Sequence, residues 1–451
     1  MKSVKRIILT FGILVSCCTV MGQDGSISSP SPTFHWKCNT ILNRTNSRDI
    51  INHNPVLRLS GRAIVVDSLP YAKDYTMIVV YKADTNEETP LWQMTFGDSA
   101  TQGVTTERFI TDTISTRYVE HTKINPIINT LQQSSPDSIS PFIRLVLGDN
   151  TFQGRIKLAE AMFFNKRLGN SMLRRIQSAL AIRYGITLGP VNYVDGNGNK
   201  IWDHADNGRY HHRVTGIGRD STSGLYQIRS RSEMDGAILT IATDTIEERS
   251  FLMIGDDDEP LLFEQDNGGV ETLIRQWRVQ ATGMVANSFS FIFDTRNLLL
   301  PTDSLVLLID RYIILPSSST SNEVQFDDVW LPSDTCTFTL ARGSILWQIA
   351  QSDTYDSKGG RFTSNADNSY FGIKPLINIF PNPSAGHYTI EVSKAKWVHA
   401  FIYNNHGTLV ATHLDSGKEH YTFSGSLPLG NSYYVKVTTE SASRTMKLIV
   451  K

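Results

Sequence analysis

Cysteine, unbalanced charge and long apolar runs are all scarce in this 451-residue chain. Lys plus Arg (43) nearly cancels Asp plus Glu (44), which excludes strong steering toward polyanions, so no nucleic-acid partner is expected. No run after residue 22 is long and apolar enough to span a membrane. Of the four cysteines, only Cys38 and Cys336 lie beyond that point. They either bridge distant parts of the chain or are two separate buried thiols.

Residues 1–22 have the organisation of a secretory signal peptide. Lys2, Lys5 and Arg6 precede an apolar run at residues 7–15, and small residues precede Gln23. We therefore expect export and cleavage before Gln23. The sequence Leu-Val-Ser-Cys at residues 14–17 also resembles the lipobox of bacterial lipoproteins, so lipidation of Cys17 is the alternative.

The length predicts about three domains. In the first block, short β-branched and aromatic runs alternate with Asp, Asn, Gly and Ser turns, which indicates a β-sandwich. The clearest strands are expected at residues 63–66, 75–81, 91–96, 142–147 and 156–164.

Residues 170–184 break this pattern, because their apolar side chains recur at helical spacing. We expect one amphipathic helix, with Asn170 as its N-cap and Gly185 as its C-terminal stop. Arg174, Arg175 and Arg183 on this helix form either a basic face for anionic glycans or, in the simpler interpretation, a solvated face.

Residues 165–188 resemble the end of a LamG-type, concanavalin-like sandwich of Bacteroidota surface proteins. That group has a strand, NRAL and a helix ending YLAIKYGITL. Here Asn-Lys-Arg-Leu stands at 165–168 and Ala-Leu-Ala-Ile-Arg-Tyr-Gly-Ile-Thr-Leu at 179–188. The Trp-containing start of the group falls at residues 34–38. The resemblance implies a LamG-like sandwich over residues 23–188.

Residues from 189 to about 350 resemble an uncharacterised β-rich domain that follows the LamG-like unit in the same surface proteins, and this domain is expected over residues 189–374. The resemblance rests on Ile-Trp-Asp at 201–203, Val-Thr-Gly-Ile-Gly-Arg-Asp at 214–220 and Arg-Gln-Trp-Arg-Val-Gln-Ala-Thr-Gly at 275–283. It implies no activity, because that family is not assigned one.

One loop in this second block has oxygen-bearing side chains at the spacing of a calcium loop. The candidate ligands are Asp195, Asn197, Asn199, Asp203 and Asp206. Lys200 stands where the EF-hand loop needs Gly, and the last ligand is Asp rather than Glu. A Gly/Asn hairpin turn followed by a strand from Ile201 explains the same residues.

Two further groups in this block carry side chains of types that bind metal ions. The acidic run at residues 255–259 is either a cation site or a solvated turn. His204, His211 and His212 lack a Cys/His partner at zinc spacing, which favours a polar surface loop.

Residues 375–451 resemble the type A sorting domain of the Bacteroidota type IX secretion system. The matching residues are Pro381, Asn382, Pro383, Gly386, Gly407, Lys447 and Lys451. The central motif spans residues 403–410. Family members usually have an acidic or apolar residue before the Gly of this motif, whereas this chain has Asn-Asn-His at residues 404–406. The resemblance implies a small immunoglobulin-like sandwich that the type IX secretion machinery recognises at the outer membrane. It also implies tail removal, then release or attachment, with surface lipopolysaccharide as the anchor.

Asp-Ser and Asp-Thr triplets recur along the chain and resemble the O-glycosylation acceptors of Bacteroidota envelope proteins, although Asp-Ser is also ordinary turn chemistry. The acceptor side chains would be Ser68, Ser99, Thr113, Ser138, Ser221, Thr245 and Ser304.

Together these features predict a mainly β protein at the cell surface or outside the cell: a LamG-like sandwich closed by one helix, a second β-rich domain and a small C-terminal sandwich. The leading hypothesis is non-catalytic binding of a glycan or a protein through the LamG-like sandwich. The alternative is a surface hydrolase acting on polysaccharide. Glu233 and Asp235 begin the E-x-D pattern of concanavalin-like hydrolases, but the closing Glu is absent. No G-x-S-x-G or H-E-x-x-H motif is present.

Overall fold

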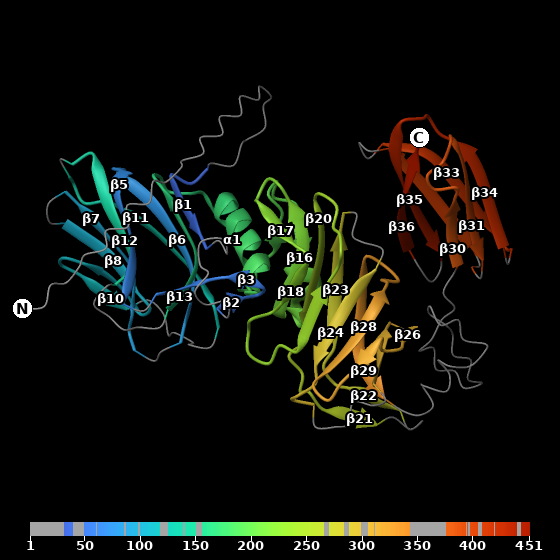
Figure 1. Cartoon of the computed structure of the whole chain (residues 1–451), viewed down its shortest axis with the longest axis horizontal. Helices are drawn as coiled ribbons and strands as arrows, with labels where there is room; N and C mark the ends of the chain where they lie inside the picture. The colour runs from blue at the N-terminus through green and yellow to red at the C-terminus, as the bar shows by residue number, and fades with distance from the viewer. Residues whose placement is uncertain are drawn as a thin grey trace, which may run out of the picture. The chain divides into compact units, whose positions relative to one another are not determined.

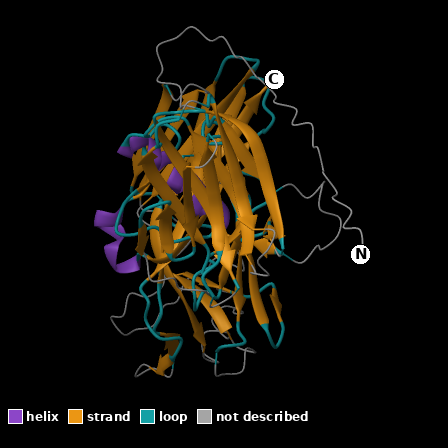
Figure 2. Ribbon diagram, turned by 90° about the vertical axis from the view of Figure 1, so that its left-hand side faces the viewer, coloured by secondary structure: helices purple, strands orange, loops and turns teal. Residues whose placement is uncertain are grey.

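The computed structural model in Figure 1 is built almost entirely of antiparallel β-sheets, and strands dominate the ribbon in Figure 2. This confirms the predicted mainly β class. The structure describes residues 31–38, 49–59, 61–84, 87–97, 100–117, 125–138, 140–149, 156–265, 270–283, 288–298, 305–310, 312–342, 376–393, 395, 397–404, 408–418, 420–439 and 443–451. The expected signal peptide, with Cys17, lies outside these residues.

The first block forms two sheets packed face to face. The five-stranded sheet has the order β1 (Phe34–Lys37), β13 (Ile156–Phe164), β6 (Asp74–Ala83) and β11 (Ile127–Ser134), with β4 (Leu57–Leu59) also paired to β13. The six-stranded sheet has the order β10 (Ser115–Arg117), β9 (Arg108–Thr111), β8 (Ala100–Thr105), β7 (Pro90–Phe96), β12 (Phe142–Asp149) and β5 (Arg62–Pro70). Between β1 and β4 in the sequence, β2 (Ile50–Ile51) and β3 (Asn54–Pro55) form a short hairpin.

A single apolar core joins these two sheets. Tyr75 of β6 meets Trp92 of β7 edge to face, with ring centroids 6.4 Å apart, and stacks on Phe163 of β13. Such aromatic pairs add to the energy of area burial. The five strands expected from the sequence are all present as β5, β6, β7, β12 and β13.

The expected helix is α1 (Asn170–Tyr184). Its end is as predicted: Gly185 is left-handed (φ 62°) and its N–H bonds to the carbonyl of Ala181. The expected N-cap is wrong, because Gly169 occupies that position and no side chain caps the helix. Only the first half of α1 is partly exposed, whereas residues 178–184 are buried on every side.

The last turns of α1 are buried because sheets pack on both sides of them. Ile78 and Val80 of β6 share a core cluster with Leu180 and Ile182 of α1 and with Met253 from the second block. The alternate residues of β6 point into the first sandwich. Strand β6 is therefore buried on both faces, which explains its unbroken apolar sequence.

The second block also consists of two packed sheets. The nine-stranded sheet has the order β17 (Leu225–Gln227), β16 (His212–Asp220), β20 (Ser250–Asp256), β23 (Trp277–Thr282), β29 (Thr335–Arg342), β22 (Glu271–Leu273) and β21 (Phe263–Gln265), with β25 (Leu305–Ile309) on β29 and β26 (Tyr312–Ile314) on β25. The five-stranded sheet has the order β18 (Arg229–Arg231), β19 (Leu239–Ala242), β24 (Phe289–Asp294), β28 (Glu323–Val329) and β27 (Ser318–Ser319). Trp277 and Phe338 stack in the core between them, with ring centroids 5.7 Å apart.

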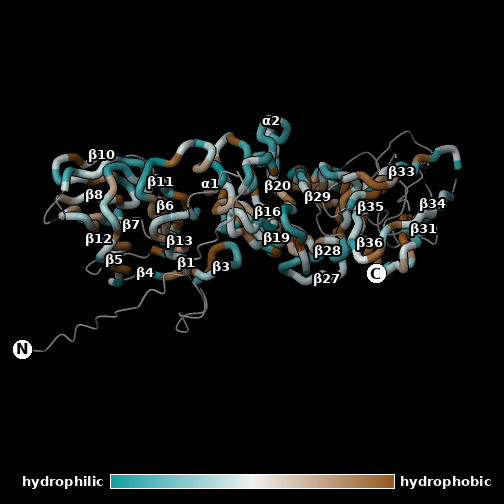
Figure 3. The backbone as a smooth tube through the Cα atoms, turned by 90° about the horizontal axis from the view of Figure 1, so that it is seen from above, coloured by the Kyte–Doolittle hydropathy of each residue, from teal (hydrophilic) through white to brown (hydrophobic). Residues whose placement is uncertain are grey.

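Before these sheets the chain forms the hairpin β14 (Tyr193–Val194) and β15 (Lys200–Trp202), the short helix α2 (His204–Asn207) and a 3₁₀ turn η1 (Gly208–Tyr210). Helix α2 appears in hydrophilic teal in Figure 3. No helix in the described part of the chain has the length and hydropathy of a membrane span.

The tail forms a separate small sandwich. Its three-stranded sheet has the order β30 (Leu376–Phe380), β31 (His387–Ser393) and β34 (His420–Ser426). Its four-stranded sheet has the order β33 (Leu409–Ser416), β32 (Trp397–Asn404), β35 (Asn431–Thr439) and β36 (Ser443–Val450). The two sheets enclose a core of their own, which includes Tyr388, Ile390, Ile402 and Val435.

Cys38 follows β1 and Cys336 lies in β29, and both are buried. The two thiols do not form a disulfide with each other. Burial raises the pKa of the Cys336 thiol well above its ordinary value, so this cysteine behaves as a small core hydrophobe.

Candidate functional site

The two ends of the tail meet through the side chain of Asn382. Its Nδ2 donates to the carbonyl of Lys447 (2.7 Å), and its Oδ1 accepts from the N–H of Ile449 (3.0 Å). One amide side chain thus bonds along the edge of the last strand, β36, as a paired strand would. The flanking Pro381 and Pro383 both follow cis peptide bonds.

Ser384 continues this contact with its main chain. Its N–H donates to the carbonyl of Ile449 (2.7 Å), and its carbonyl accepts from the N–H of Lys451 (2.8 Å). Gly386 closes the turn with a left-handed backbone (φ 101°). The Pro-Asn-Pro motif and the basic end, separated by some sixty residues, therefore form one structure. Gly407 lies outside the described residues.

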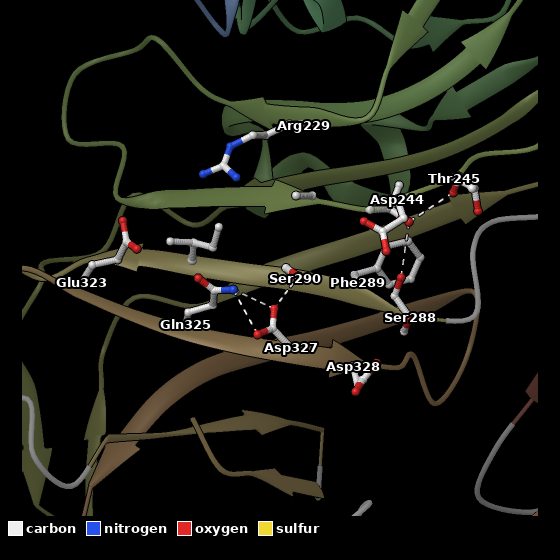
Figure 4. Close-up of a pocket in the computed structure, with 13 residues that line it drawn as sticks. Arg229, Asp244, Thr245, Ser288, Phe289, Ser290, Glu323, Gln325, Asp327 and Asp328 are labelled. Carbon is white, nitrogen blue, oxygen red and sulfur yellow. Dashed lines mark hydrogen bonds between the residues drawn. The ribbon is translucent and has the colours of Figure 1, made fainter. Parts of the chain in front are cut away.

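A polar hollow of about 610 Å³ lies on the outer face of the five-stranded sheet of the second block (Figure 4). It is lined mainly by hydrogen-bonding and charged side chains, among them Arg229, Asp244, Glu323, Gln325, Asp327 and Asp328. Sequence reasoning missed this site, since its residues come from four strands and carry no motif.

Asp327 is the most firmly held side chain of the hollow. It accepts from Ser290 Oγ (2.6 Å), Ser317 Oγ (2.7 Å) and Gln325 Nε2 (2.8 Å). The Ser290 hydrogen bond, with those of Gln325 and Ser317, outweighs burial and lowers the pKa of Asp327. Asp327 is thus a fixed, ionised acceptor.

A β-bulge shapes this part of the hollow. Phe291 pairs with Phe326 and Phe289 with Val329, so both Asp327 and Asp328 lie opposite Ser290. Asp328 takes a left-handed backbone (φ 53°). Bulges of this kind redirect side chains at functional sites.

The predicted calcium loop is the β14–β15 hairpin. Asp195 is buried and accepts from the main-chain N–H groups of Asn197 (2.9 Å) and Asn199 (2.8 Å). Asp203 caps α2 through the N–H of Ala205 and pairs with Lys200. The hairpin-turn interpretation is confirmed. The two aspartates are engaged in local bonds, and the calcium site stays a prediction that this geometry does not favour.

Of the two alternatives for the acidic run at residues 255–259, a cation site or a solvated turn, the solvated turn is wrong for its first two aspartates. Asp256 is buried and paired with the Arg213 guanidinium through two hydrogen bonds of 2.5 and 2.8 Å. Buried Asp257 accepts from the N–H of Gln276 (3.0 Å). Within the described part of the chain, no group of three or more His, Cys, Asp and Glu side chains is arranged to hold a metal ion.

His211 was expected in a polar surface loop, but it is built into the structure. Its Nδ1 accepts from Trp202 Nε1 (3.0 Å), and its Nε2 lies 2.8 Å from the carbonyl of Gly189. Burial lowers its pKa. His204 packs against it with ring centroids 4.5 Å apart, while His212 is exposed near Asp258.

Arg183 does not belong to a solvated basic face. It is buried and pairs with the buried Glu160 of β13 (2.8 Å), which also accepts from Tyr184 (2.8 Å) and lies 2.6 Å from His35 Nε2. Arg174 and Arg175 are partly exposed. The expected interpretation of the helix surface is therefore wrong for Arg183.

Glu233 is likewise structural. It accepts from the N–H of Asn52 (2.8 Å) and lies 3.3 Å from Lys82 Nζ. Asn52 is itself buried in a left-handed conformation, and its side chain donates to the carbonyls of Ile182 and Arg183. These contacts join the hairpin β2–β3 and helix α1 to the second block, and the sequence carries no local signal for them.

The predicted O-glycosylation acceptors differ in their accessibility. Ser68, Thr113, Ser221 and Thr245 are exposed, and Ser138 is partly buried. Ser99 and Ser304 lie outside the described residues. Exposure is a requirement for modification, so the first four stay candidates.

Two family models match the chain. Residues 378–451 match the secretion system C-terminal sorting domain, which supports a type IX secretion cargo and indicates a cell-surface or extracellular location. Residues 172–343 match a domain of unknown function (DUF8202). That match begins inside α1, so it groups the helix with the strands that follow. Neither model matches the first sandwich, and its LamG-like character stays a prediction.

No curated protein matches the chain. Similar solved structures include a β-glucuronidase of Faecalibacterium prausnitzii, with 12% identity and a TM-score of 0.17, where the match covers 48% of this chain and 42% of that one. A glucanotransferase of Paenibacillus sp. has 10% identity and a TM-score of 0.16, and the match covers 69% of this chain and 46% of that one. For β-glucuronidase 2 of Bacteroides uniformis the identity is 13% and the TM-score 0.13, with 36% of this chain and 26% of that one covered. The chain spans less than half the length of each. At these TM-scores the similarities carry no argument about fold or activity.

Proposed function

We propose that this type IX cargo is a non-catalytic surface binder whose ligand is a glycan, and that the polar hollow holds the glycan. The observation that carries the proposal is the preorganised Asp327, with three side-chain donors already in place. Around Asp327 the lining of the hollow combines the Glu323 carboxylate, the Gln325 amide and the Arg229 guanidinium, so it offers sugar hydroxyls both acceptors and donors. This differs from the expectation that the first sandwich would bind.

The electrostatics of Asp327 argue against a role for this residue as the general acid of a glycosidase. A glycosidase needs a carboxylic acid whose pKa is raised so that it can donate a proton. The pKa of Asp327 is lowered instead, by the Ser290 hydrogen bond first. A carboxylate of this kind accepts hydrogen bonds throughout the neutral range.

The rest of the proposal concerns organisation. We propose three domains, at residues 23–188, 189–374 and 375–451, after a signal peptide at residues 1–22. The tail is removed at the surface, and the remainder is anchored on lipopolysaccharide or released. The exposed acceptors Ser68, Thr113, Ser221 and Thr245 carry O-linked sugar.

A glycan array probed with the signal-less chain tests the binding site. We expect Asp327→Ala and Arg229→Ala each to weaken binding about tenfold, the effect of losing one charge-assisted hydrogen bond. Glu264→Gln on β21 is the matched control, because this exposed carboxylate lies outside the hollow. Equal melting temperatures would show that all three variants fold.

Three results would oppose the proposal. An array with no bound glycan would leave a protein ligand as the candidate. Unchanged binding by both hollow variants would move the site elsewhere. New reducing ends released from a polysaccharide would support the hydrolase alternative.

A further inference from the structure

The two sheets of the tail sandwich have outer faces of different chemistry. Strands β31 and β34 expose polar side chains such as His387, Glu391, Thr422 and Ser424. Such alternation is typical of a sheet with one face in the core and the other in water. The outer face of the four-stranded sheet is different.

Strand β32 is apolar or aromatic on both faces. Val398, Ala400 and Ile402 enter the core. The alternate positions, on the outer face, are Trp397, His399, Phe401 and Tyr403. The centroid of the His399 ring lies 4.6 Å from that of Trp397 and 6.3 Å from that of Phe401. On the edge strand β33, Leu409 is 49% exposed and Leu414 is 59% exposed. Apolar side chains gathered in this way mark an interaction surface.

Strand register aligns the outward side chains in rows. Leu409 pairs with Tyr403, Tyr403 with Tyr434, and Tyr434 with Lys447, so one row crosses all four strands. Lys447 Nζ lies 6.0 Å from the centroid of the Tyr434 ring, within cation–π range. A neighbouring pair in the same sheet is Phe401 and Lys436.

This row unites two motifs that are far apart in the sequence. Tyr403 begins the central motif and Lys447 begins the basic end, and the sheet brings both onto one face with Tyr434 between them. The Asn382 contacts with β36 hold the last strand, and hence Lys447, in this register.

We propose that this outer face, defined by Phe401, Tyr403, Leu414, Tyr434 and Lys447, is the surface that the type IX secretion machinery binds. The partner surface is apolar, complementary to the aromatic row. Lys436 and Lys447 lie beside this row and already have carboxylate partners in the chain, Asp334 at 3.3 Å and Glu247 at 3.6 Å. The inference rests on the proposed export route and adds the face and residues that are recognised.

The test follows the full chain, with its signal peptide, in a bacterium that has a type IX secretion system. Tyr434→Ser with Leu414→Ser removes apolar surface without touching the core or the Asn382 contacts. The matched control is Thr422→Ala with Ser424→Ala on the polar face. We expect the first pair to lower surface protein about tenfold, as loss of an aromatic anchor does, while protein accumulates in the periplasm and the control stays at the surface.

A third chain lacking residues 376–451 separates the two proposals. If this deletion leaves export unchanged, the export route itself is wrong. If the deletion blocks export and the Tyr434/Leu414 variant exports normally, only the assigned face is wrong. If the Tyr434/Leu414 variant alone has a lower melting temperature, the face packs within the chain and is not the binding surface. If the wild-type chain is a dimer and the variant is a monomer, the face binds a second copy of the chain instead.

Discussion

Glu160 and Arg183 form a buried ion pair beneath helix α1, and His35 and Tyr184 complete the bonds of the carboxylate. Burial alone would raise the pKa of Glu160. The His35 hydrogen bond and the Arg183 charge more than offset that effect and lower the pKa to about 2. Ionised Glu160 is therefore more favourable in the folded chain than in the unfolded one.

The folded protein should lose stability at low pH because of this group. The contribution of Glu160 is complete above its ordinary pKa of 4.5 and is lost as the pH falls toward about 2. It amounts to at most about 3 kcal/mol of unfolding free energy. Denaturant unfolding at a series of pH values, from about 6, above both pKa values, down to about 2, measures this loss of stability. Glu160→Gln should flatten the curve in this window, whereas Asp67→Asn, an exposed carboxyl, should not. A wild-type curve as flat as that of Glu160→Gln would contradict the assignment.

Sequence alone could not place these side chains. Arg183 lies on a helix whose spacing predicts a solvated position, and its partner Glu160 is on a strand of the preceding sheet. Asn52 bonds to residues more than a hundred positions away. A pattern shows which residues share a face of one element, but it does not show which second element covers that face.

Helix α1 shows what an element's sequence can and cannot reveal. Its bounds and its Gly185 end follow from local periodicity and from the conformational freedom of glycine, and both were predictable. Its burial on two sides depends on β6 and on strands of the second block, which no local pattern encodes. The Asn170 cap failed for a related reason, because Gly169 already provides the extended N-cap backbone.

Gly185 should tolerate no side chain. Its φ is 62°, and an added Cβ would lie 2.3 Å from the carbonyl oxygen of Arg231. We expect Gly185→Ala to cost about 2 kcal/mol or more, through backbone strain and the clash. Gly189→Ala is the control, since a Cβ there meets nothing within 4 Å. Thermal unfolding of both variants measures the effect. Equal melting temperatures for the two would show that the junction after α1 adapts.

In the tail, the functional motifs were predictable from the sequence and the contacts between elements were not. Its motifs were readable from sequence, and the matching family model supports them. The contact between Asn382 and β36 was not readable, because a motif gives residue types and spacing without saying what each side chain bonds. The polar hollow is less predictable still, since it depends on one bulge and on side chains from separate strands.

At the scale of the whole molecule, the tail determines where the upstream sheets act. Its sandwich has a core of its own, and its first motif is bonded to its last strand. We therefore propose that the machinery recognises a folded surface of the tail. Residues upstream of the tail supply the binding function proposed for the hollow.

The most direct test of this account is export of Asn382→Ala beside Asn378→Ala in a bacterium with a type IX secretion system. Asn382 holds β36 through two hydrogen bonds, whereas Asn378 is an exposed residue of β30 in the same stretch. Quantifying surface and periplasmic protein should find Asn382→Ala retained in the periplasm and Asn378→Ala at the surface. Wild-type surface levels of Asn382→Ala would contradict the claim that the folded tail is the export signal.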